Sequence, residues 1–119
     1  MTQGRLNLTV GALEGAPLLK ATGDIDFLTL DQLGRAVKRI LNRGSGMTFF
    51  DFRNVRSIDT GAVTIFMDAC RSVGPERKLC IIAHGQPEQV LRKTRLDSMI
   101  YVVGDAAEAA GLMRNVGGN

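Results

Sequence analysis

The feature that most constrains this chain is an apolar run that leads through a polar turn into an amphipathic segment. Residues 47–52 are almost entirely apolar, which is typical of a central strand covered on both faces. A short polar turn over 53–58 follows, and residues 59–61 open a predicted helix over 62–73. The start of a helix carries unpaired backbone N–H groups and partial positive charge, which suit an anion such as a phosphate. We therefore expect the function to lie at this turn.

Helix and strand signals alternate along the rest of the chain. An apolar–polar alternation predicts a strand over residues 6–10, and a short turn joins it to a second strand over 17–22, so we expect an antiparallel hairpin. Further strands are expected over 79–83 and 99–103, and helices over 30–41, 87–94 and 105–113. This order predicts an α/β fold, a mixed sheet of about five strands with about four helices packed on it, joined by right-handed crossovers.

Loops at the carboxyl ends of neighbouring strands are where a ligand is expected in such a sheet. Residues 23–26 are predicted to form one of these loops, and the turn at Asp59 forms the next. Thr29 and Gln32 have the spacing of a capping box at the start of the helix that follows the first loop. Asp24 and Asp26 are typical turn and capping residues, and they could border the Asp59 turn.

The composition is that of a soluble globular protein. With 119 residues, 45% of them apolar and 23% charged, the chain has the size of one domain over residues 1–119, with a frayed tail at about 115–119. The net charge of +3 is spread along the sequence, and with no Trp and one Tyr few aromatic rings could stack on bases, so we expect no nucleic-acid partner. No apolar run approaches the roughly 20 residues of a membrane span, so we expect no direct membrane insertion.

The cysteines and the single histidine show no pattern that would hold a metal or support catalysis. Cys70 lies on an apolar helix stripe and Cys80 in an apolar strand, so both are expected to be reduced core residues, which fits a cytoplasmic location. His84 has no nucleophile beside it, and Ser57 and Thr64 have no paired base. We therefore expect no catalytic residue, no metal site and no cofactor.

The turn Asp59-Thr60-Gly61-Ala62 allows three interpretations. It can be a simple helix start, with Asp59 as N-cap, Thr60 in the first turn and Gly61 easing the approach of the backbone. It can present the Thr60 hydroxyl to a partner or a kinase. A phosphate on Thr60 would interact favourably with the N-terminus of the helix but would crowd the Asp59 carboxylate, so phosphorylation could act as a switch. The same letters occur in aspartic proteases, where two carboxylates share a proton, but those enzymes are nearly all β, whereas a helix is predicted here.

Three segments of the chain, in order, resemble the STAS family, which includes anti-sigma-factor antagonists and cytosolic parts of some anion transporters. Residues 23–26, followed by an amphipathic helix, are similar to the family segment Gly-Glu-Leu-Asp. Residues 50–55 are similar to its strand Leu-Asp-Leu-Ser-x-Val, and residues 58–61 fall where the family has a hydrophobic residue and then Asp-Ser-Ser-Gly-Leu. The resemblance covers about Leu6 to Met113 and implies the STAS fold.

The chain departs from the family at the position of the regulatory phosphate. In antagonists controlled by phosphorylation, the modified Ser or Thr is the second residue after the Asp, and that residue is Gly61 here, with Ala62 at the family glycine. Thr60 takes the first hydroxyl position. Either Thr60 is phosphorylated through a local shift, or the chain does not use this switch; Ser57 is the second candidate for phosphorylation.

The resemblance implies a bacterial, non-catalytic protein-interaction module that takes part in transcription regulation. Its expected partner is an anti-sigma factor with serine-kinase activity, bound through the Asp59 turn and the following helix, and we expect a monomer or weak homodimer. The alternative is the STAS subunit of a phospholipid-transport ABC complex, whose Asp-Thr-Gly form is similar and whose helix after this turn docks on the ATPase subunit. An aspartic-protease-like enzyme is the remote alternative. The residues expected to bind the partner are Asp24, Asp26, Ser57, Asp59, Thr60, Gly61, Ala62 and Thr64.

Overall fold

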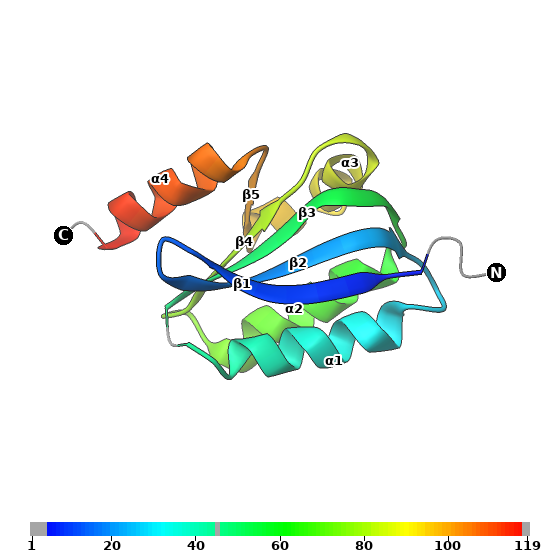
Figure 1. Ribbon diagram of the computed structural model, residues 1–119, viewed down its shortest axis with the longest axis horizontal. Helices are drawn as coiled ribbons and strands as arrows, with labels where there is room; N and C mark the ends of the chain where they lie inside the picture. The colour runs from blue at the N-terminus through cyan, green and yellow to red at the C-terminus, as the bar shows by residue number, and fades with distance from the viewer. Residues whose placement is uncertain (1–4, 45, 118–119) are drawn as a thin grey trace.

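Five strands form one mixed sheet, and α-helices lie on both of its faces (Figure 1). The structure is a computed structural model that describes residues 5–44 and 46–117. The strands follow one another in the sheet in chain order, with the first pair antiparallel and the other three pairs parallel. The α/β fold predicted from the sequence, with five strands and four α-helices in the described residues, is confirmed.

The elements have the following bounds. The strands are β1 (Asn7–Leu13), β2 (Ala16–Ile25), β3 (Met47–Ile58), β4 (Lys78–Ile82) and β5 (Tyr101–Val103). The helices are α1 (Leu30–Leu41), α2 (Gly61–Val73), α3 (Gly85–Lys93) and α4 (Ala106–Gly117), with a short 3-10 helix η1 at Leu96–Ser98. Helix α4 includes residues 115–117 of the tail that was expected to be frayed, and residues 118–119 lie outside the described part of the chain.

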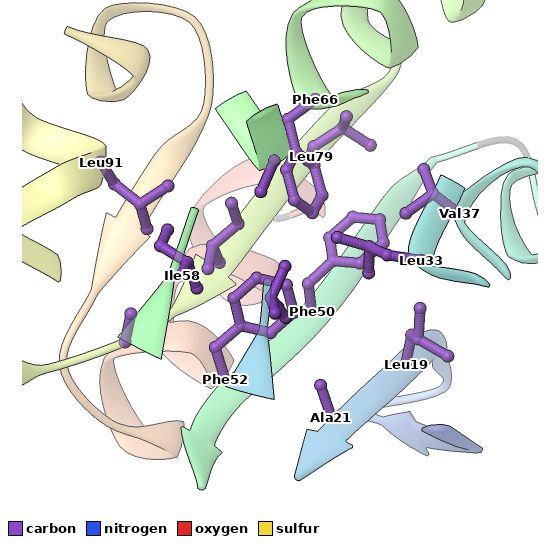
Figure 2. Close-up of a cluster of buried hydrophobic side chains, with 14 of the residues drawn as sticks. Leu19, Ala21, Leu33, Val37, Phe50, Phe52, Ile58, Phe66, Leu79 and Leu91 are labelled. Carbon is purple, nitrogen blue, oxygen red and sulfur yellow. The ribbon is translucent and has the colours of Figure 1, made fainter. Parts of the chain in front are cut away.

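The central strand β3 is covered on both faces. Phe50 and Phe52 point toward α1 and α2, whereas Phe49 points to the opposite face, where α4 packs. Figure 2 shows the ring of Phe66, from α2, against Phe50 and Phe52, with ring centroids 4.9 Å and 5.8 Å apart in edge-to-face arrangements. Because both faces are buried, the strand is a continuous apolar run in the sequence, as predicted for residues 47–52.

Two segments that the sequence predicted to be turns are strands instead. Strand β3 continues through residues 53–58, and β2 continues through residues 23–25. These two strand ends pair with each other in parallel, with Asp24 opposite Ser57 and Ile25 opposite Ile58, after two irregularities in the register. The pairing satisfies backbone groups that a turn would leave open, while the polar side chains of this part of β3 point to solvent.

The capping box predicted at the start of α1 is wrong. Thr29 is the N-cap but makes no side-chain capping bond; its hydroxyl instead accepts a hydrogen bond from the backbone N–H of Asp26 (2.9 Å). Gln32 donates from Nε2 to the carbonyl of Leu6 (3.0 Å) and so ties α1 to the chain before β1. The carboxylate of Asp26 accepts from the backbone N–H groups of Leu28 and Thr29 (2.9 Å and 3.1 Å), which organises the loop between β2 and α1.

Candidate functional site

The turn between β3 and α2 is held by short hydrogen bonds. The backbone N–H of Asp59 donates to the carbonyl of Ile25 (2.7 Å), which joins the turn to the end of β2. One carboxylate oxygen of Asp59 accepts from the N–H of Gly61 (2.7 Å), and the Asp59 carbonyl accepts from the N–H of Ala62 (3.0 Å). Asp59 was expected to be the N-cap. The N-cap residue is Thr60, which makes no side-chain capping bond, and Asp59 supplies the capping carboxylate from one position earlier.

The turn presents polar side chains to solvent. Asp59 and Thr60 are exposed and Gly61 is half-buried, while residues 61–73 form the helix α2. Ala62 is fully buried beneath the turn, whereas Thr64 is exposed on the first turn of α2. A carboxylate and a hydroxyl are therefore accessible together at the N-terminal end of a long helix, and Ala62 supports that surface from below.

Gly61 is the residue that allows α1 and α2 to approach closely at their N-terminal ends. A Cβ atom at this position would lie 2.5 Å from Cδ1 of Leu30 and 3.2 Å from the Asp59 carboxylate. The Leu30 contact is with the flexible end of a side chain, so a small residue could be accommodated if Leu30 changed its rotamer. The predicted role of Gly61, close approach at the helix start, agrees with this geometry.

Three of the other predicted residues lie at the same edge of the sheet. Asp24 is paired with Arg56 through two hydrogen bonds, Nη2 to Oδ2 at 2.8 Å and Nε to Oδ1 at 3.2 Å. Ser57, the register partner of Asp24, is exposed. Asp26 lies in the adjoining loop, where its carboxylate is occupied by backbone N–H groups. The arginine partner of Asp24 was not foreseen, because it depends on the pairing of β2 with β3.

Two apolar residues beside the turn were also missed. Phe27 and Leu28 follow β2 and are 80% and 84% exposed, the highest values among the exposed large hydrophobic residues of the described chain. They lie between Asp26 and Thr29, in the loop that starts directly after the Ile25 carbonyl to which the turn is bonded. Nothing in the sequence indicates this exposure, because an apolar residue next to a helix is usually part of the core.

Gln86 supports the site from α3 and was likewise missed. Its side-chain oxygen accepts from the backbone N–H of Ile58 (2.9 Å), and its Nε2 donates to the Ile58 carbonyl (3.3 Å). The last residue of β3, directly before the turn, is therefore held on one side by β2 and on the other by a side chain of α3. A glutamine at a helix start is common on protein surfaces, so its sequence gave no sign of this contact.

An ion pair between the buried Asp51 and the exposed Arg53 lies on β3 away from the turn. The carboxylate of Asp51 accepts from Nε and Nη2 of Arg53 (2.9 Å and 2.8 Å) and from the Arg53 backbone N–H (3.1 Å). Burial raises the pKa of Asp51, but the hydrogen bonds from Arg53 and the charges of Arg53 and Lys20 outweigh it, so the pKa lies below its ordinary value. The pair stabilises the face of the sheet on which α4 packs and has no contact with the turn.

The remaining reactive groups lie apart from the turn. Burial, with a smaller contribution from Glu108, raises the pKa of the Cys80 thiol to about 12, and burial also raises the pKa of the half-buried Cys70 thiol. Neither is a thiolate at neutral pH, as expected for cysteines of the core. Within residues 5–44 and 46–117, no three His, Cys, Asp or Glu side chains are grouped so that they could hold a metal ion. No helix in the same residues combines the length and apolar character that crossing a membrane requires.

Comparison with known proteins agrees with this fold. The family described as STAS domain matches residues 7–110. An anti-sigma factor antagonist from Mycobacterium paratuberculosis has a TM-score of 0.85 at 18% identity, over 93% of this chain and 96% of that chain. No curated protein sequence gives a significant match.

Two structures of SpoIIAA are also similar. The anti-sigma factor antagonist SpoIIAA in its unphosphorylated form has a TM-score of 0.64 at 13% identity, over 95% of this chain and 98% of that chain. The phosphorylated form of the Bacillus cell fate determinant SpoIIAA has a TM-score of 0.57 at 10% identity, over 89% and 99% of the two chains. At such identities the likeness shows a shared fold.

Proposed function

The chain belongs to the STAS domain family, and we propose that it is a non-catalytic interaction module of the anti-sigma-factor antagonist kind. In this proposal it binds an anti-sigma factor, through that factor's kinase-like ATPase domain, with the Asp59-Thr60-Gly61 turn and the first turns of α2. The observation that carries the proposal is the exposure of Asp59 and Thr60 on a turn whose backbone is fixed by hydrogen bonds to β2 and by the Asp59 carboxylate.

The surroundings of the turn support a protein partner. Stable protein interfaces combine a few large apolar or aromatic anchors with a polar rim. Phe27 and Leu28 would provide such anchors, and the turn with the Asp24–Arg56 pair would provide the rim. An exposed Phe-Leu pair is costly for a monomer in water, and contact with a partner would bury it.

The unusual residue at position 61 bears on regulation. Gly61 cannot carry a phosphate, and its N–H, which would meet a phosphate at the helix start, already donates to Asp59. A phosphate on Thr60 would have to compete with this carboxylate and would add like charge beside it. We therefore favour constitutive binding, with Thr60 and then Ser57 as the hydroxyls on which a switch would depend.

Intact-mass measurement tests the switch. The chain and a Gly61→Ser variant are incubated with a sigma-regulator serine kinase and ATP. We expect an added phosphate on Gly61→Ser and none on the unmodified chain, since the variant places a hydroxyl at the family position. Its side chain requires a shift of Leu30 and a small adjustment of the Asp59 carboxylate. A phosphate on Thr60 or Ser57 of the unmodified chain would contradict constitutive binding. It would not contradict the proposal that the Asp59 turn binds the partner.

Co-purification from the native organism tests the partner. Recovery of an anti-sigma factor with a kinase-like ATPase domain supports the proposal, and Thr60→Glu should reduce that recovery. A matched variant, Glu76→Ser, changes an exposed residue in the loop after α2, at the opposite end of the sheet, and should leave recovery unchanged. Recovery of an ABC ATPase with its permease, and of no sigma regulator, would contradict the proposal and establish the transport alternative.

The protease alternative has no support in the architecture. The Asp-Thr-Gly enzymes it was compared with are nearly all β, whereas the turn here leads into the helix α2. Peptide cleavage at acid pH that an aspartic-protease inhibitor blocks would be needed to revive it.

A further inference from the structure

A cleft of about 690 Å³ lies between α1 and α2, running from the middle of each helix to its C-terminal end. It is distinct from the Asp59 turn, which lies at the N-terminal end of α2. Much of its wall is apolar and comes from residues at helical spacing on the two facing helices. These residues are Val37 and Leu41 of α1, and Ile65, Ala69 and Val73 of α2.

Arg77 lines this cleft from the loop before β4, and two nitrogens of its guanidinium group have no hydrogen-bond partner among the described residues. The Nε and Nη2 atoms of Arg77 are buried and have no hydrogen-bond partner among the described residues. A buried charged donor without an acceptor is unfavourable, because the group has lost its hydration and gained nothing in return. Because Arg77 lines the cleft, a rotation of its flexible side chain would bring this unpartnered donor pair against an anion bound there.

Two other arginines of this chain, Arg53 and Arg56, each use the same pair of nitrogens, Nε and Nη2, to bind a carboxylate. Arg53 holds the carboxylate of Asp51 through Nε and Nη2, at 2.9 Å and 2.8 Å. Arg56 holds the carboxylate of Asp24 through Nε and Nη2, at 3.2 Å and 2.8 Å. This edge of a guanidinium group matches the spacing of two oxygens of a carboxylate, sulfonate or phosphate. In Arg77 the equivalent edge has no carboxylate against it within residues 5–44 and 46–117.

Gly34 is an independent sign that the cleft is kept open. It lies inside α1, where glycine weakens a helix relative to alanine, and it is not among the glycines with positive φ. A Cβ atom there would meet only Cδ1 of Ile65, at 3.8 Å, which is an ordinary contact. Neither backbone conformation nor close packing requires the glycine, but a large side chain at this position would enter the cleft that Gly34 lines.

The polar residues of the cleft favour an anion over a cation. Lys38 and Arg77 both line it, whereas Asp68, its one acidic lining residue, is paired with Arg71 at 3.3 Å. The C-terminal ends of α1 and α2 carry partial negative charge and would oppose an anion. Lys38 and Arg77 offset this effect. The apolar wall and the unpartnered Nε and Nη2 of Arg77 therefore favour a ligand with an apolar body and an anionic head.

We propose that the cleft binds a small organic anion, with its acidic head against Nε and Nη2 of Arg77 and its hydrocarbon or aromatic body between α1 and α2. The volume lies within the range of about 300–1,000 Å³ that is usual for small-molecule sites. This site is separate from the proposed protein-docking surface, and its existence does not depend on that function.

A titration followed by ¹H–¹⁵N NMR tests the site, with octanoate as the probe and 1-octanol as its uncharged analogue. Octanoate should shift the signals of residues around Val37, Leu41, Ala69 and Arg77 and reach saturation. Octanol should bind at least about tenfold more weakly, because it lacks the charge that Arg77 recognises. Equal affinities for the two probes, or shifts located elsewhere, would overturn the proposal.

Variants separate the charged and apolar parts of the site. Arg77→Gln should weaken octanoate binding about tenfold or more and leave octanol binding unchanged. Gly34→Leu should weaken both probes, because its side chain occupies the cleft, and a dispersed spectrum confirms that either variant is folded. The matched control is Arg39→Gln, which removes an exposed charge of α1 that does not line the cleft. Octanoate affinity that is the same in Arg77→Gln and the unmodified chain would contradict the assignment.

Discussion

Replacing Phe27 or Leu28 by serine separates a docking role from a structural role. Both side chains are almost fully in solvent, at 80% and 84% exposure, so the fold gains little from them. The hydrogen bond that Leu28 makes to Asp26 uses its backbone N–H and survives the substitution. We therefore expect each variant to keep its free energy of unfolding within about 0.5 kcal/mol of the unmodified chain.

The loss of affinity can be worked out from the same exposures. Complete burial of a side chain of this size is worth about 1.5–3 kcal/mol. Since about four-fifths of each side chain is still exposed, burial against a partner could contribute roughly 1–2.5 kcal/mol for each residue. That range corresponds to a Kd raised by about 5- to 60-fold in either single variant.

Two measurements on the same preparations check this reasoning. Urea unfolding gives the stability, and calorimetric titration with the anti-sigma factor recovered by co-purification gives the Kd. Met99→Ser is the control, because Met99 is 44% exposed and lies before β5, at the other end of the sheet. Unchanged affinity in both loop variants, or a loss of stability that matches the loss of binding, would refute the docking role of this pair.

Three further substitutions test the turn and the ion pair of Asp51 with Arg53. Thr60→Glu should raise the Kd about tenfold by calorimetry, because it adds charge and bulk to the contact surface; an unchanged Kd would place the contact elsewhere. Asp59→Ala should lower the free energy of unfolding by about 1 kcal/mol in urea, through loss of the bond to Gly61, and no change would show that the bond does not contribute. The lowered pKa of Asp51 stabilises the fold above the unfolded-state value near 3.8, and this contribution is lost as the pH falls through the folded-state pKa. Asp51→Asn should therefore lower the free energy of unfolding at pH 7 and flatten its decline below about pH 4, whereas an unchanged acid profile would assign that decline to other groups.

The parts of the fold that the sequence could predict are those set by burial. The apolar run at 47–52 reflects a strand covered by helices on both faces, and the spacing of Leu33, Val37 and Ile40 reflects one buried face of α1. The hairpin of β1 and β2 follows from a short connection between two strand patterns. Each of these signals is local, so no knowledge of distant contacts was needed.

The ends of β2 and β3 could not be predicted in this way. Residues 23–25 and 53–58 are rich in polar and small side chains, which is typical of turns. They are extended because each satisfies the backbone of the other, a pairing between positions some 30 residues apart along the chain. Gln32 shows the same limit, since its contact with the Leu6 carbonyl replaced the local capping bond.

The candidate site was predicted only in part for a related reason. Local capping chemistry indicates that the Asp59 carboxylate satisfies the start of α2, but the carboxylate acts from one position before the N-cap and not from the N-cap itself, as the sequence had predicted. The roles of Arg56 and Gln86 depend on neighbours that the fold brings to the same edge. Phe27 was overlooked because an apolar residue next to a helix is usually part of the core, whereas here it points to solvent.

Hydrogen–deuterium exchange of the chain, alone and with the protein recovered by co-purification, tests the central claim most directly, because it locates the contact without any substitution. The claim predicts slower exchange in the complex at residues 24–30 and 57–66, with β1 and the C-terminal halves of α1 and α2 unchanged. Slower exchange confined to β1 and the C-terminal halves of α1 and α2, with residues 24–30 and 57–66 exchanging as fast as in the free chain, would contradict the claim.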